Sequence, residues 1–64
     1  MPVISMAMAE TDKSKKEELI KRLSTAASEV TNLPLDAFTV LISEYESDNI
    51  GLGGKTLSDV MASR

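Results

Sequence analysis

Residues 11–32 of this 64-residue chain, TDKSKKEELIKRLSTAASEVTN, decide its fold because they carry its clearest secondary-structure pattern. Apolar residues recur at the three- and four-residue spacings of an amphipathic helix, namely at Leu19, Ile20, Leu23, Ala26, Ala27 and Val30. On the outer face we expect ion pairs between successive turns, Glu17 with Lys21 and Glu18 with Arg22. The segment therefore predicts one helix of about 18 residues.

Both ends of this helix carry capping signals. Thr11 and Asp12 are candidate N-caps, and Ser14 with Glu17 offers a competing capping box. Asn32, followed by Pro34, marks the end of the helix. The start of the helix is therefore defined to within a few residues.

The segments on either side of the helix alternate with the period of a β-strand. Residues 3–9, VISMAMA, place Ile4, Met6 and Met8 on one face and Val3, Ser5 and Ala7 on the other. Residues 37–45, AFTVLISEY, alternate in the same way, with Phe38, Val40 and Ile42 on one face. Strand, helix and strand in this order form a βαβ unit, in which the strands run parallel and the crossover is right-handed in nearly all cases.

The last part of the chain, ESDNIGLGGKTLSDVMASR, predicts a hairpin or tight loop and a short apolar-spaced tail. We expect positive φ angles at the glycines of the loop, Gly51, Gly53 and Gly54. The tail carries Leu57, Val60 and Met61. Residues 1–64 are thus expected to form a single α/β domain.

Composition excludes several functional classes. The chain has 42% hydrophobic residues, a net charge of −3, and neither cysteine nor histidine. Disulfides, Ser-His and Cys-His catalytic pairs and the usual zinc ligands are therefore ruled out, and we expect neither a metal nor a cofactor. The acidic balance and the presence of one Tyr and one Phe argue against nucleic-acid binding. With no membrane-length apolar run and no signal peptide, we expect a cytoplasmic protein.

The small size of the predicted fold points to assembly. Two strands beneath one helix leave one sheet face and both edges uncovered, and an isolated two-stranded sheet is marginal in water. The second face of the strand at 3–9 is also mostly apolar, and the chain has four methionines. We therefore expect a homo-oligomer whose subunit interfaces cover these surfaces.

Pro2 is the first candidate catalytic residue. Methionine is normally removed before a residue as small as proline, so the mature chain is expected to begin with a secondary amine. An α-amino group has a reference pKa of about 7.7–8.0, and burial lowers it further. Such an amine can take a proton from one position of an enolisable compound and return it at another. If Met1 stays, the same nitrogen is an amide without basicity.

Two further features have weaker functional interpretations. The stretch NIGLGGKT resembles a phosphate-binding loop, but Asn49 occupies the place of its first glycine and too little chain follows for the required helix. Lys13, Lys15 and Lys16 crowd the helix start, where they form a solvated basic patch or hold a carboxylate.

Several of these signals occur together and in order: P-V-I at the start, LIKRLSTAASEV in the helix, P-L-x-x-x-x-V-x-I-x-E across the second strand and N-I-G-L-G-G after it. In this order and spacing the chain resembles the small-subunit 4-oxalocrotonate tautomerase family over nearly its whole length. The resemblance implies βαβ subunits that form dimers and commonly a trimer of dimers. It also implies an amino-terminal proline as catalytic base, and Pro2 falls on that proline.

The chain departs from the family at the substrate-binding positions. The family enzyme that handles a dicarboxylated dienol uses two arginines and an aromatic residue, and the aligned positions here carry Thr11, Thr39 and Ile50. These three positions are kept as candidate substrate-binding residues. A diacid would have to be held by Lys13, Lys15, Lys16 or Lys55, whose ammonium groups bind as point charges and do not make the bidentate contacts of an arginine.

We therefore expect a cofactor-independent tautomerase in which Pro2 moves a proton within a small enol or keto-acid substrate. We expect a homohexamer, with a dimer as the smaller alternative. The rival interpretation is a catalytically silent oligomeric binding or scaffold protein that has kept the fold. Loss of both arginines favours the rival, whereas Pro2 and the GLGG loop favour the enzyme.

Overall fold

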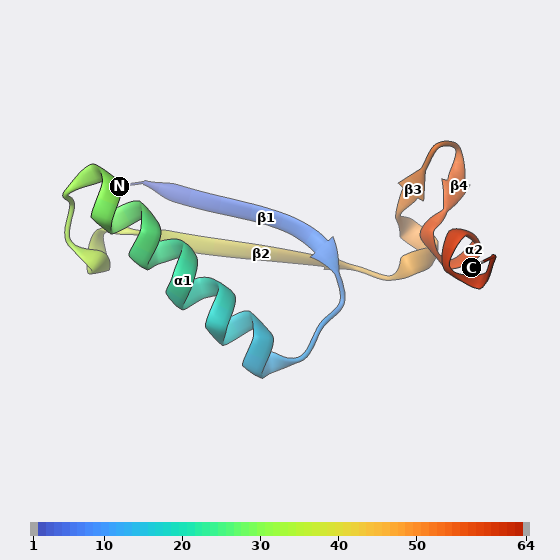
Figure 1. Ribbon diagram of the computed structural model, residues 1–64, viewed down its shortest axis with the longest axis horizontal. Helices are drawn as coiled ribbons and strands as arrows, with labels where there is room; N and C mark the ends of the chain where they lie inside the picture. The colour runs from blue at the N-terminus through green and yellow to red at the C-terminus, as the bar shows by residue number, and fades with distance from the viewer. Residues whose placement is uncertain (1, 64) are drawn as a thin grey trace.

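The computed structural model describes residues 2–63 and shows the predicted βαβ unit (Figure 1). Strand β1 (Val3–Ala9) leads into helix α1 (Lys13–Thr31), which returns the chain to strand β2 (Thr39–Tyr45). The strands run parallel, in a register that begins at Val3 with Thr39 and ends at Ala9 with Tyr45. The expected removal of Met1 concerns a residue outside the described range.

Helix α1 begins at the cap that Asp12 supplies. The Asp12 Oδ1 atom accepts hydrogen bonds from the Lys15 amide at 2.8 Å and from the Ser14 hydroxyl at 2.9 Å. These bonds satisfy one of the free amides of the first turn, so Asp12 rather than Thr11 or Ser14 is the N-cap. At the other end Asn32 adopts the left-handed conformation with φ 61°, and its amide donates to the Ser28 carbonyl at 2.9 Å.

One of the two predicted ion pairs is present. Arg22 Nε lies 2.6 Å from Glu18 Oε2, as expected. Glu17 instead contacts Lys13, at 3.8 Å on the preceding turn. The pairing of Glu17 with Lys21 was therefore wrong, because the glutamate side chain turns toward the start of the helix.

The second strand begins two residues later than predicted. Residues Leu35–Ala37 form a short 3-10 helix, η1, directly after Pro34. The hydrogen bonds of this turn are local: the Ala37 amide donates to the Pro34 carbonyl at 3.0 Å, and the Phe38 amide donates to the Leu35 carbonyl at 3.3 Å. The amides of Ala37 and Phe38 are therefore already hydrogen-bonded within the turn, and pairing with β1 starts at Thr39.

Helix α1 packs on one face of the sheet, and the alternation predicted for β1 is confirmed. Ile4, Met6 and Met8 are half-buried, whereas Val3, Ser5 and Ala7 are exposed. The covered stripe of the helix differs from the predicted one and comprises Lys16, Leu19, Leu23, Ser24, Ala27 and Ser28. Ser24 is 9% exposed, whereas Ile20, Ala26 and Val30, predicted to face inward, are exposed. The face of α1 that packs on the sheet is therefore centred near Ser24, and Ile20 and Val30 lie outside it.

The single chain leaves its apolar side chains at least partly exposed throughout the described residues. Among residues 2–63 no hydrophobic side chain is buried. The accessible surface is 4973 Å², whereas a compact monomer of this size exposes about 4,000 Å². The radius of gyration is 15.0 Å, against about 11 Å for a compact domain of this length. About one fifth of the surface is therefore in excess of what a self-sufficient domain would show.

Residues 46–63, which we call the C-terminal arm, project from the end of β2 away from α1 (Figure 1). They contain a 3-10 turn η2 (Ser47–Asn49), an antiparallel hairpin of β3 (Gly51–Leu52) and β4 (Lys55–Thr56), and the short helix α2 (Leu57–Ala62). Gly53 and Gly54 have φ values of 59° and 85°, as two-residue hairpin turns require. The hairpin is thus confirmed, but Gly51 lies in β3 and does not have the positive φ that we expected.

Candidate functional site

Pro2 lies half-buried at the start of β1, beside the beginning of β2. Its carbonyl accepts a hydrogen bond from the Thr39 amide at 3.1 Å. The parallel register therefore brings together two predicted site residues, Pro2 and Thr39, that are far apart in the sequence.

Thr11 lies at the opposite end of the sheet, in the loop between β1 and α1. Its amide donates to Glu44 Oε2 at 2.8 Å, and Lys16 Nζ lies 2.8 Å from the other oxygen, Glu44 Oε1. The Lys16 and Glu44 side chains are 31% and 26% exposed, so water reaches this pair only in part. Glu44 thus joins the end of β2 to the loop and to the first turns of α1, an arrangement that we call the Glu44 clamp.

The clamp also favours the ionised form of the Glu44 carboxyl group. The hydrogen bond from Lys16, and secondly the one from the Thr11 amide, lower the pKa of the Glu44 carboxyl below its ordinary value. A carboxylate held in this way is a poor proton acceptor near neutral pH. Glu44 stays exposed to water, and it meets the Thr11 loop because the parallel strands β1 and β2 end at the same edge of the sheet.

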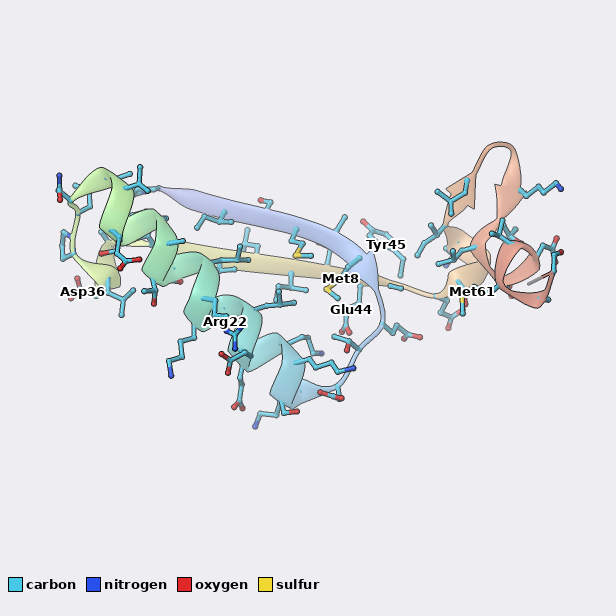
Figure 2. All side chains as sticks on the ribbon, viewed as in Figure 1. Met8, Arg22, Asp36, Glu44, Tyr45 and Met61 are labelled. Atoms are coloured by element: carbon cyan, nitrogen blue, oxygen red, sulfur yellow. The ribbon has the colours of Figure 1, made fainter. Side chains whose placement is uncertain are left out.

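A cavity of about 310 Å³ lies beside the clamp, between α1 and the end of β1. It is lined by Met8, Thr11, Lys15, Glu18, Leu19 and Arg22. Figure 2 shows Met8 and Glu44 near the far end of the two strands and Arg22 on α1. We call this the helix-side cavity, and it is the one that contains the predicted residue Thr11.

Ile50 lines a second cavity, of about 270 Å³, where the C-terminal arm meets the end of the sheet. The other lining residues are Ala7, Met8, Ala9, Tyr45, Leu52 and Leu57. The Ile50 carbonyl accepts the Leu57 amide at 2.7 Å, which fixes Ile50 between β2 and α2. This cavity, which we call the arm cavity, is mainly apolar.

Lys13 lies apart from both cavities. Its side chain is 90% exposed and pairs with Glu17 at 3.8 Å. Lys13, a predicted substrate-binding residue, therefore lines neither the cavity that contains Thr11 nor the cavity that contains Ile50. Lys15, which the sequence did not separate from its neighbours, lines the helix-side cavity instead.

The predicted site residues fall into two groups at opposite ends of the sheet. Pro2 and Thr39 lie at one end, and Thr11 and Ile50 lie at the other. The six steps from Val3 to Ala9 span about 20 Å. One chain therefore does not bring the four residues into a single pocket.

The remaining candidate sites have little support in the structure. The GLGG segment forms a hairpin turn in place of a phosphate-binding loop. Within residues 2–63 no group of three or more Asp or Glu side chains is arranged to hold a metal ion. In the same range no helix is long and apolar enough to cross a membrane.

Comparison with known proteins assigns the family. Residues 2–60 match the family described as "Tautomerase enzyme". The chain is 36% identical over 62 residues to a 2-hydroxymuconate tautomerase of a Pseudomonas species, covering 94% of this chain and 97% of that protein. It is 33% identical over 60 residues to a "Probable tautomerase" of Bacillus cereus, covering 92% and 98%.

A solved structure gives the same result. The heterohexameric 4-oxalocrotonate tautomerase of Chloroflexus aurantiacus superposes with a TM-score of 0.88 at 26% identity, covering 94% of this chain and 98% of that one. The fold is therefore that of a small tautomerase subunit. The chain belongs to the 4-oxalocrotonate tautomerase family, within the tautomerase superfamily, and is an enzyme of the isomerase class.

Proposed function

We propose that the protein is a cofactor-independent tautomerase in which the nitrogen of Pro2, freed by removal of Met1, is the general base and then the general acid. The observation that carries the proposal is the family match, which begins at residue 2. It is supported by the half-buried position of Pro2 and by the absence of histidine and cysteine from the chain. Because its pKa is lowered, the Glu44 carboxylate is a weaker candidate for the general base than Pro2.

The proposed reaction is a proton transfer within one substrate molecule. The lone pair of the Pro2 nitrogen takes the proton of the enol hydroxyl, and the electron pair of that O–H bond forms the carbonyl. The electron pair of the C=C bond then takes a proton from the Pro2 ammonium at carbon, which restores the neutral amine. Substrate and product are isomers, and no oxidant or reductant is required.

Assembly supplies the rest of the site in this proposal. Both strands of the sheet are edges, and two chains that pair antiparallel about a two-fold axis place the start of one β1 beside the end of the other. Pro2 of one subunit would then lie beside the arm cavity containing the partner's Ile50. A homohexamer built from such dimers is the expected state, by analogy with the heterohexameric relative, and the excess exposed surface supports it.

The substrate class follows from Thr11 and Thr39. Neither side chain carries a charge, so the chain lacks, at these positions, the two arginine guanidinium groups that would hold a diacid through bidentate contacts. Each missing charge-assisted contact removes about 1.5–3 kcal/mol of binding. We therefore propose a small enol or keto acid with one carboxylate as the substrate.

Replacing the two prolines of the chain separately tests the proposal. Pro2→Ala keeps an amine in nearly the same place, so reduced but measurable ketonisation of a small enol acid is expected. Pro34→Ala is the matched control, because Pro34 precedes η1, and it should keep wild-type turnover. Equal activity in all three proteins would show that the proline ring is not required, whereas full turnover by a chain that retains Met1 would exclude the Pro2 nitrogen as the base. An inactive wild-type oligomer with confirmed loss of Met1 would support the silent scaffold instead.

A further inference from the structure

The three lysines at the start of α1 have different surroundings. Lys13 pairs with Glu17 at 3.8 Å, and Lys16 pairs with Glu44 at 2.8 Å. Within residues 2–63, Lys15 has no carboxylate within ion-pair distance. It is also the one lysine of the three that lines the helix-side cavity. Of these three lysines, Lys15 alone therefore lines a cavity without a carboxylate at ion-pair distance, and Asp12 attracts it only at longer range.

The other charges of the helix-side cavity cancel. Arg22 Nε and Glu18 Oε2 lie 2.6 Å apart, so this pair contributes almost no net charge. Lys15 then leaves the lining with one net positive charge. The walls opposite are apolar, formed by Met8 and Leu19, and Thr11 adds a hydroxyl. Such a lining favours a ligand that has one negative charge and an apolar body.

The size of the cavity sets a limit on that ligand. A volume of about 310 Å³ is at the small end of ligand sites and corresponds to about ten water molecules. A compound of about ten to twelve non-hydrogen atoms fits this space. Aromatic or branched enol acids with a single carboxylate are of this size.

We propose that Lys15, together with the Thr11 hydroxyl, holds the single carboxylate of the substrate in the helix-side cavity. This cavity shares Met8 with the arm cavity, beside which Pro2 of a second subunit is proposed to lie. Lys15 lies one turn beyond Thr11 and supplies there the positive charge that Thr11 lacks. The Glu44 clamp keeps the Thr11 loop against the start of α1, and Thr11 and Lys15 line the same cavity. This inference rests on the proposed function for its catalytic readout, whereas its binding readout stands without it.

Binding is measured first, because it needs no turnover. Titration calorimetry with phenylpyruvate and with its methyl ester compares a monoanion with a neutral ligand of nearly the same shape. Lys15→Gln should weaken binding of the acid at least tenfold and leave ester binding within twofold. Lys21→Gln is the matched control, since Lys21 is an exposed lysine of the same helix outside this cavity. Lys15→Arg should restore binding of the acid.

Turnover gives an independent readout. With an enol monoacid, Lys15→Gln should raise KM at least tenfold with little change in kcat, and the enol ester should be unaffected. Equal effects of Lys15→Gln and Lys21→Gln, or equal losses for acid and ester, would overturn the assignment of Lys15. Reduced ester turnover in Pro2→Ala with intact acid binding would separate the base from the anion site. A failure of the proposed function is therefore distinguishable from a failure at Lys15.

Discussion

Leu41 tests most sharply whether the uncovered sheet is a subunit interface. It lies on the face of β2 opposite α1 and is 53% exposed in the single chain. Fully burying a leucine side chain contributes about 1.5–3 kcal/mol, so burying its exposed half contributes about 1 kcal/mol. A symmetric contact between two such sheet faces contains this residue twice, which gives about 2 kcal/mol per contact. Leu41→Ala should therefore weaken association through this face about 30-fold.

Leu41→Asp should have a larger effect. It would place an unpaired carboxylate in each half of the interface, and each costs several kcal/mol. Sedimentation velocity at micromolar concentration should show the wild type as an oligomer and Leu41→Asp as smaller species or unfolded chain. Leu41→Met keeps the side-chain volume and should assemble like the wild type. A wild-type monomer, or normal assembly of Leu41→Asp, would refute this reasoning.

Three further predictions follow from the cap, the clamp and the substrate class. Asp12→Ala should destabilise the protein by about 1 kcal/mol in chemical denaturation, whereas Asp36→Ala should not. Because the pKa of Glu44 is lowered on folding, its stabilising effect is complete above the ordinary glutamate pKa and is lost at lower pH. Glu44→Gln should therefore destabilise the protein at neutral pH and lose this effect in acid, as thermal unfolding against pH would show. Kinetics should favour an enol monoacid at least tenfold over a dicarboxylated dienol, and a preferred diacid would contradict the assignment of Thr11 and Thr39.

The strands and the helix could be predicted because their patterns are local. The alternation in residues 3–9 and the helical spacing of Leu19, Leu23 and Ala27 are short-range signals, and the structure confirms both. The helix face was less well predicted, because Ile20 and Val30 are apolar but exposed in the single chain. Apolar side chains that are exposed in a single chain have the same spacing as core residues, so the sequence pattern does not separate the two.

Pro2 is predicted as the base from its chemistry alone, because the secondary amine left by removal of Met1 would be distinctive, and its role stays a prediction. The clamp joins Glu44 to Thr11 and Lys16 over 33 and 28 residues, and this contact depends on the parallel register rather than on a motif. Lys15 differs from Lys13 only by its direction around α1, since successive residues turn by about 100°. Which of the two lysines lies beside the cavity depends on how α1 packs on the sheet, and the sequence alone does not give this packing.

The most direct measurement of the central claim is the pH dependence of kcat/KM for protein whose intact mass shows the loss of Met1, compared with protein that retains it. For the processed chain, kcat/KM should rise with pH through one ionisation at or below the ordinary α-amino pKa of about 7.7–8.0, as the Pro2 amine loses its proton. The chain that retains Met1 should be inactive, because its Pro2 nitrogen is an amide. Full turnover by the chain that retains Met1 would contradict the role of Pro2 as the base.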